Sequence, residues 1–140
     1  MKAKVKTYFI ISLLFVLLFC VSACAPNEKN ATASSTDKAY TKISQDVAKD
    51  MILKDGSLVI VDVRTKSEYE QGHIPGAVLI PNESITDRKP ELLPDMNQVI
   101  LVYCRSGNRS KQAAQKLANM GYKKVCEFGG INTWNGKIVK

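Results

Sequence analysis

Cys104 is the residue with the clearest capacity for chemistry in this chain of 140 residues. It follows an apolar run at 99–103, and an amphipathic pattern begins six residues after it, at Ser110. Arg105 and Arg109 enclose a short Ser-Gly-Asn turn. A thiol before a helix N-terminus and between two guanidinium groups lies in surroundings that favour the thiolate. Because the thiolate is the nucleophilic form, the pattern predicts a nucleophilic cysteine.

The elements that position Cys104 follow from the hydrophobic pattern of the chain. Apolar runs without a polar face predict buried strands at 58–63, 77–80, 99–103 and 124–128, with a short strand at 40–43. Helical spacing predicts helices from Ser44 to before Gly56, over 65–71 and over 110–120, with a last helical turn near 133–134. Alternating strands and helices indicate an α/β fold, a small domain whose mostly parallel central sheet is flanked by helices. Ligands bind beyond the carboxyl ends of such strands, where Cys104 and Asp62 both lie.

The first 38 residues have the pattern of a targeting segment and a linker. Lysines at positions 2, 4 and 6 precede an almost continuously apolar run at 8–21, which is short for a membrane-spanning helix and typical of a signal peptide. Small residues before Cys24 resemble the lipobox of bacterial lipoprotein precursors, in which the cysteine is lipidated. We therefore expect a signal peptide at 1–23, the lipidated Cys24 with a flexible tether at 24–38, and the folded domain at 39–140. An uncleaved anchor or an ordinary secretory signal is the alternative.

This organisation predicts an extracytoplasmic, membrane-anchored lipoprotein in a bacterial cell envelope. Removal of the signal lowers the net charge from +7 to +4, and the lysines that stay form no block, so nucleic acid is not an expected partner. Cys104 and Cys126 are the cysteines of the domain. Outside the cytoplasm a disulfide between them is conceivable, and a packed free thiol at Cys126 is the alternative. No cluster has the spacing of a metal site, so neither a metal nor a cofactor is expected.

Three motifs resemble the signatures of rhodanese-type sulfurtransferases and occur in the order found in that family. The first is Asp62-Val63-Arg64 followed by the stretch EYEQGHIPGA at 68–77. The second is the loop Cys104-Arg105-Ser106-Gly107-Asn108-Arg109, and the third is Gly129-Gly130 with Trp134. The resemblance implies a rhodanese-like domain similar to thiosulfate:cyanide sulfurtransferases, in which Cys104 takes up sulfane sulfur as a persulfide.

The loop from Cys104 to Arg109 is expected to bind an anion. A tight turn can point successive backbone N–H groups at the sulfur, and Gly107 permits the unusual φ that such a turn requires. Arg105 and Arg109 are expected to bind the substrate anion, such as the sulfonate end of thiosulfate, through their guanidinium forks. The alternative for Arg109 is an ion pair with a structural acid. The other expected members of this substrate-binding loop, which contribute N–H groups at its rim, are Ser106 and Asn108.

Three further residues of the motifs are expected to support the site rather than to react. Asp62 and Arg64 are interpreted as a buried ion pair or cap that holds the loop. His73 is the only histidine and invites a general-base role. The resemblance instead places His73 in a structural turn before a strand. Trp134 is expected in the core, with the pocket rim as the alternative.

The leading hypothesis is a sulfurtransferase that moves sulfur from a small anionic donor to a thiol or cyanide acceptor through Cys104. A second hypothesis is a phosphatase or an arsenate reductase. Phosphatases of this fold have a loop one residue longer, so the spacing from Cys104 to Arg109 favours sulfur. A third is a persulfide carrier or redox sensor for a membrane partner, in which Cys126 resolves oxidised Cys104. Nothing in the sequence identifies the donor, the acceptor or a protein partner.

Overall fold

The computed structural model describes residues 40–140, which contain almost all of the predicted domain. The predicted signal peptide, Cys24 and the tether lie outside these residues. Within the described part of the chain, no helix is both long enough and apolar enough to cross a membrane.

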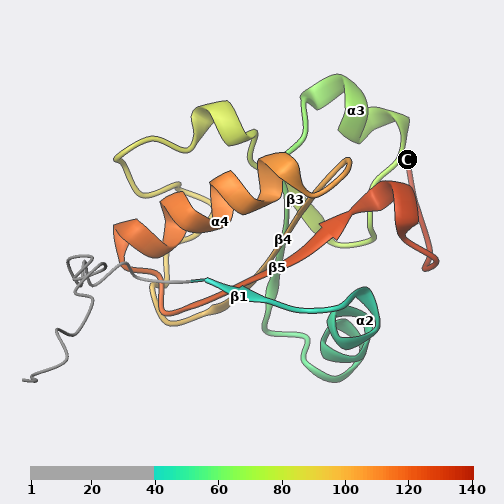
Figure 1. Ribbon diagram of the computed structural model, residues 1–140, viewed down its shortest axis with the longest axis horizontal. Coiled ribbons are helices and arrows are strands. Elements are labelled where there is room, and N and C mark those ends of the chain that lie inside the picture. The colour runs from blue at the N-terminus through green and yellow to red at the C-terminus, as the bar shows by residue number, and fades with distance from the viewer. Residues whose placement is uncertain (1–39) are drawn as a thin grey trace, which may run out of the picture. The chain divides into compact units, whose positions relative to one another are not determined.

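A five-stranded parallel sheet forms the centre of the domain (Figure 1). Its strands are β1 (Thr41–Lys42), β2 (Val59–Asp62), β3 (Ala77–Leu79), β4 (Val99–Cys104) and β5 (Lys124–Gly130). They lie in the order β1-β5-β4-β2-β3, so β5, β4 and β2 are interior strands. The apolar runs of β4 and β2 are covered on both faces, as expected for a parallel sheet. The predicted α/β fold class is confirmed.

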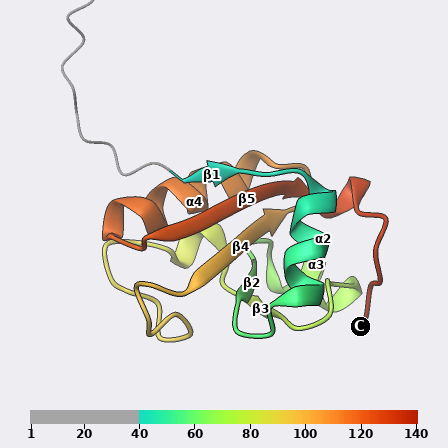
Figure 2. The same cartoon turned by 90° about the horizontal axis from the view of Figure 1, so that it is seen from below.

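Helices cover both faces of the sheet (Figure 2). The helices are α2 (Gln45–Lys54), α3 (Lys66–Gln71) and α4 (Asn108–Met120), with short 3-10 turns η1 (Asn82–Ser84) and η2 (Ile131–Thr133). On one face, α4 buries Ala113, Ala114 and Leu117 against the sheet. On the other face, α2 buries Ala48 among aromatic and aliphatic side chains that include Tyr103 and Phe128.

The helix ends follow from local sequence. The Ser44 hydroxyl accepts a hydrogen bond from the Val47 N–H and caps α2. Thr65 and Glu68 form a capping box at the start of α3, each side chain accepting from the backbone N–H of the other. Gly121 ends α4 in the left-handed conformation, which glycine adopts readily at helix ends.

Two element boundaries differ from the sequence-based expectation, and both lie beside Cys104 at the carboxyl end of β4. Helix α4 begins at Asn108 rather than at Ser110, because Gly107 takes the left-handed conformation and lets the chain enter the helix two residues earlier. Strand β5 continues to Gly130, where it pairs with Cys104 after a register shift beyond Val102. Both glycines of the Gly-Gly segment belong to this strand: Gly129 has a φ of 95°, and Gly130 is extended backbone beside the loop.

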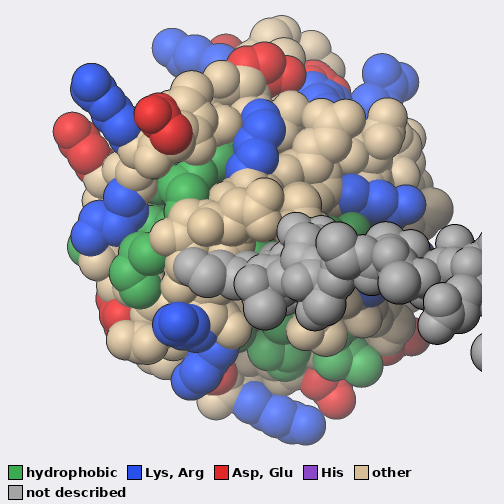
Figure 3. Space-filling model, turned by 60° about the vertical axis from the view of Figure 1, so that its left-hand side comes forward, with side chains coloured by type: hydrophobic (Ala, Val, Ile, Leu, Met, Phe, Trp, Pro, Cys, Tyr) green, Lys and Arg blue, Asp and Glu red, His purple; other side chains and the backbone are tan. Residues whose placement is uncertain are grey.

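The surface carries both signs of charge in mixture. On the face shown in Figure 3, lysine and arginine side chains are scattered among acidic ones over the visible part of the domain. A duplex-binding protein needs phosphate-contacting cations gathered on one face. This face offers no such gathering.

Candidate active site

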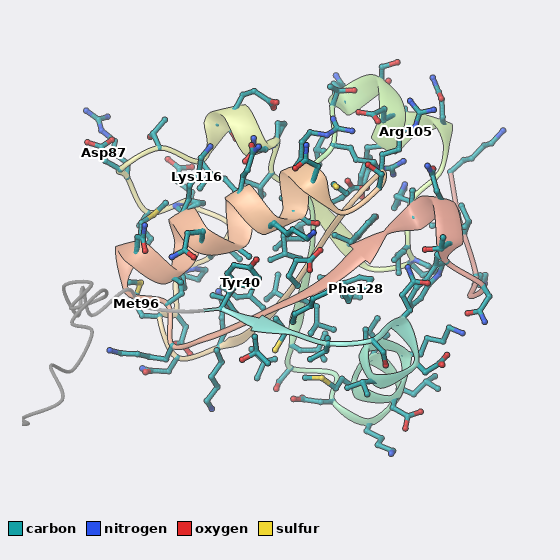
Figure 4. All side chains as sticks on the ribbon, in the orientation of Figure 1. Tyr40, Asp87, Met96, Arg105, Lys116 and Phe128 are labelled. Atoms are coloured by element: carbon teal, nitrogen blue, oxygen red, sulfur yellow. The ribbon has the colours of Figure 1, made fainter. Side chains whose placement is uncertain are left out.

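Cys104 is the last residue of β4, at the carboxyl edge of the sheet and directly before α4. Its residue exposure is 1%, so the thiol is buried under the loop that follows. Arg105 lies at this end of the molecule in Figure 4, near α3, whereas Lys116 lies further along α4. Cys104 and Arg105, two residues of the predicted site, therefore lie at the same end of the sheet.

The loop directs backbone donors at the sulfur. The Gly107 N–H donates to Cys104 Sγ over 3.1 Å. Burial raises the pKa of the Cys104 thiol, but its hydrogen bonds with the Ser110 side chain and with backbone N–H groups outweigh this effect, and the pKa is lowered overall. These N–H groups belong to Ser110, Gly107 and Ser106. The arrangement is a nest that stabilises negative charge on sulfur.

Two glycines give the loop its shape, and they lie in different parts of the chain. Gly107 has φ of 99°, a conformation that side-chain-bearing residues rarely adopt. Gly130 touches the loop so closely that a Cβ there would lie 2.3 Å from the carbonyl oxygen of Arg105. That same carbonyl accepts a hydrogen bond from the Asn132 N–H over 3.1 Å. The turn after Cys104 is thus held from outside by the end of β5.

Ser110 and Glu127 complete the floor of the site, and sequence reasoning missed both. The Cys104 thiol lies 3.6 Å from Ser110 Oγ, which donates to Glu127 Oε1 over 2.7 Å. The same oxygen accepts from the Gly129 N–H over 2.9 Å. Glu127 is completely buried, and strand alternation with Val125 could have indicated its inward direction.

Arg109 is engaged by a carboxylate. Its two terminal nitrogens donate to the two oxygens of Glu68 over 2.7 and 2.8 Å. The Arg109 guanidinium, together with the Thr65 cap, lowers the pKa of Glu68 to about 2 despite the opposing effect of burial. The ion pair that was the alternative for Arg109 is present, and binding of a substrate anion by this side chain stays a prediction.

Arg105 presents a free cationic group beside the loop. Among the residues that the structure describes, its side chain has no hydrogen-bond or ion-pair partner, and it is exposed. It borders a hollow of about 430 Å³ between the loop, α3 and the segment after β5. The lining residues are Arg64, Glu68, Gln71, Gly72, Arg105, Ile131, Asn132 and Ile138. Of the two predicted anion binders, Arg105 is the one whose guanidinium is available.

The predicted supporting residues connect the end of β2 with α3 and the turn that follows it. They are Asp62, Arg64 and His73. Arg64 donates to Asp62 in a buried ion pair with a shortest distance of 2.6 Å. It also donates to the Gly72 carbonyl over 2.7 Å, which ties the end of β2 to the end of α3. His73 stacks on Tyr69 with ring centroids 3.7 Å apart, and its backbone bridges to Val139. These contacts hold segments together and none of them reaches the sulfur.

Cys126 lies on the opposite face of the sheet from Cys104. It packs in the cluster that includes Tyr103 and Phe128, whereas Cys104 packs against the α4 side. Its pairing partner on β4 is Leu101, three residues before Cys104, which separates the two Cα atoms by about 10 Å. A disulfide needs Cα atoms within about 7 Å. Both thiols are free.

Comparison with known proteins shows the family of this chain. Residues 44–137 match the family model described as Rhodanese-like domain. The chain belongs to the rhodanese-like family. Its curated relatives include proteins named as sulfurtransferases.

Two curated relatives and one solved structure illustrate how far the likeness extends. The chain is 39% identical over 106 residues to "Putative sulfur carrier protein YrkF" of Bacillus subtilis, which covers 75% of this chain and 56% of that protein. It is 39% identical over 71 residues to "Thiosulfate sulfurtransferase PspE" of Escherichia coli, which covers 51% of this chain and 68% of that protein. The solution structure of the rhodanese-like domain of Alr3790 from Anabaena has a TM-score of 0.64 at 28% identity, covering 72% of this chain and 80% of that one.

Proposed function

We propose that this rhodanese-like protein is a sulfurtransferase that carries sulfur as a persulfide on Cys104, with thiosulfate as a donor and a thiol or cyanide as acceptor. The observation that carries the proposal is the group of backbone N–H donors around the buried Cys104 sulfur, among them the Gly107 N–H at 3.1 Å. A thiolate and a persulfide are both anions, so the same donors stabilise the free and the loaded site.

The proposed cycle has two displacement steps. The Cys104 thiolate attacks the outer sulfur of thiosulfate, a sulfur–sulfur bond forms on the cysteine, and sulfite leaves with the electron pair of the broken bond. An acceptor nucleophile then attacks the outer sulfur of the persulfide, and the Cys104 thiolate leaves. The exposed guanidinium of Arg105 is placed to attract the anionic donor to the loop.

The chain is proposed to act outside the cytoplasm, held at a membrane by lipid on Cys24. The support is the basic start, the apolar run at 8–21 and the small residues before Cys24. Metabolic labelling with a palmitate analogue in a bacterial host tests it. We expect label on the wild type and none on Cys24→Ala, and label on both chains would contradict a lipid on Cys24.

The test of the activity is thiocyanate formation from thiosulfate and cyanide. We expect turnover by the wild-type protein and a loss of at least about 10³-fold in Cys104→Ser, because a hydroxyl cannot store sulfane sulfur. Cys126→Ser is the matched control, since it removes the other thiol of the domain and lies on the far face. Absence of activity in the wild type, or equal loss in both variants, would contradict the proposal.

A persulfide carrier is the second candidate, and the likeness to a protein named as a putative sulfur carrier supports it. A carrier and an enzyme differ in how the sulfur leaves. After loading with thiosulfate and removal of the excess, a carrier keeps its persulfide when small thiols are added and releases it to a protein acceptor. The intact mass of the loaded protein before and after thiol addition separates the two.

A further inference from the structure

Glu127 is a buried carboxyl group that structural support alone does not explain. Its exposure is 0%, and it comes from a strand otherwise occupied by apolar residues and glycines at this end. Oε1 accepts from the Ser110 hydroxyl and the Gly129 N–H. Oε2 is buried and has no hydrogen-bond partner among the described residues. Burying an acidic group with one unpaired oxygen costs free energy, so its presence beside the sulfur calls for an explanation.

In the part of the chain that the structure describes, Ser110 has the hydroxyl that contacts both this carboxyl and the sulfur. Its oxygen lies 2.7 Å from Glu127 Oε1 and 3.6 Å from Cys104 Sγ. A hydroxyl has one proton to donate. The nearer acceptor for that proton is Glu127 Oε1, since the other acceptor, the Gly129 carbonyl oxygen, lies 3.3 Å away, and Ser110 Oγ is itself the acceptor for the thiol. A sulfur anion would need the Ser110 proton for itself, and the carboxyl would then need a proton of its own.

We propose that Glu127 stores the proton of Cys104 while sulfur is bound, receiving it through Ser110 and returning it when the sulfur leaves. The inference rests on the proposed sulfur transfer and assigns Glu127 as a positioning residue that acts on Cys104 through Ser110. The buried site then carries a single negative charge throughout the cycle, on the carboxylate before loading and on the persulfide after it.

The loading step balances with no other reactant. The thiol proton moves from Cys104 Sγ to Ser110 Oγ, and the original hydroxyl proton moves from Ser110 to Glu127. The sulfur, now an anion, attacks thiosulfate and expels sulfite. A thiol, a carboxylate and thiosulfate thus become a persulfide anion, a carboxylic acid and sulfite, with the same number of protons and the same total charge.

The unloading step reverses the proton movement. Cyanide takes the outer sulfur and leaves as thiocyanate, and the cysteine leaves as a thiolate. Glu127 then returns its proton through Ser110, which restores the thiol and the carboxylate. No proton has to be exchanged with solvent in either step.

The other charged groups near the sulfur are either held in ion pairs or extend away from the site, so Glu127 is the group that can store the proton. Arg109 of α4 interacts electrostatically with Cys104 and with Glu83, but its guanidinium is held by Glu68 of α3. Arg105 extends from the loop to the hollow. Asp62 of β2 is bound by Arg64. In the described part of the chain, Glu127 is the only glutamate that is fully buried.

Infrared difference spectroscopy of the whole protein, loaded minus unloaded, tests the proposal because a protonated carboxyl has its own carbonyl stretching band. Loading with thiosulfate is followed in parallel by intact mass. We expect the band to appear with the persulfide in the wild type and to vanish on addition of cyanide. We expect it to be absent from Glu127→Gln, and to be unchanged in the control Glu70→Gln, an exposed residue of α3.

The outcomes of this experiment separate a failure of the proposed sulfur transfer from a failure of proton storage on Glu127. A wild-type protein that gains no sulfur by mass overturns the proposed function itself. A wild-type protein that loads sulfur without the band, or a band that persists in Glu127→Gln, overturns the storage of the proton on Glu127. If Glu127→Gln does not fold, carbon-13 labelling of glutamate in the wild type replaces it, and a band that does not shift with the label overturns the assignment.

Discussion

At the scale of single residues, the site depends on the absence of a Cβ atom at Gly130. Its backbone passes so close to the loop that a Cβ would lie 2.3 Å from the Arg105 oxygen and 2.5 Å from Ser106 Cα. Both atoms are backbone, so no rotation of a side chain relieves the contact. Its φ of −128° is an ordinary extended value, so the requirement for glycine is one of space alone.

Gly130→Ala is therefore expected to move the loop. We expect a loss of about 1–3 kcal/mol in the free energy of unfolding. Sulfur loading is expected to fall by about tenfold or more, since displaced N–H groups stabilise the anion less well. Urea unfolding and intact mass after thiosulfate measure the two effects. Gly56→Ala is the control, because a Cβ there meets nothing within 4 Å. Similar losses in both variants would show that the contact is not responsible.

At the scale of elements, α3 is joined to α4 through one carboxylate. Glu68 closes the capping box of α3 and at the same time binds both terminal nitrogens of Arg109. A six-residue helix is too short to be stable by itself, so this double use of Glu68 holds α3 against the loop. The orientation of Arg109 is set by an element 41 residues away in the chain.

Glu68→Gln tests this link through the dependence of stability on pH. Arg109 lowers the pKa of Glu68 from 4.5 to about 2, so the carboxylate stabilises the fold fully above pH 4.5 and less as the pH falls towards 2. We expect the variant to lose about 1 kcal/mol at neutral pH, and the difference from wild type to shrink over that acid range. Urea unfolding across this range measures it. In Glu70→Gln, which breaks an exposed pair with Lys66, we expect at most about 0.5 kcal/mol at any pH.

The elements could be predicted from the sequence, and most of the contacts between them could not. Periodicity and capping residues such as Ser44 and Thr65 gave the helices and the strands, because these signals are local. The same patterns placed Cys104 at the edge of the sheet. The partners of Arg109 and Ser110 come from other elements, and periodicity indicates which face a residue occupies but not what lies opposite. Glu127 was missed for that reason.

At the scale of the whole molecule, the sheet separates the two thiols of the domain. Cys104 lies on the side of α4 and Cys126 on the side of α2. Burial also raises the pKa of the Cys126 thiol, which makes it a weaker nucleophile at neutral pH. A redox mechanism in which Cys126 resolves oxidised Cys104 would require the sheet to come apart.

Cys126→Ala is accordingly expected to keep sulfur loading within about twofold of the wild type, since mutations distant from a site act independently of it. Treatment of the wild type with a mild oxidant is expected to produce no internal disulfide. Intact mass measures both. A loss of two hydrogen atoms that requires both cysteines would contradict the separation seen in the structure.

The close approach of Gly130 to the loop has a consequence for protein engineering. The Arg105 carbonyl is packed by Gly130 and bound by the Asn132 N–H, both contributed by a segment that follows α4. A six-residue loop from Cys104 to Arg109, transplanted onto another strand-helix junction, would lack both of these contacts with the Arg105 carbonyl. A working transplant needs the neighbouring strand and its glycine pair as well, so the smallest transferable unit is β4, α4 and β5 together.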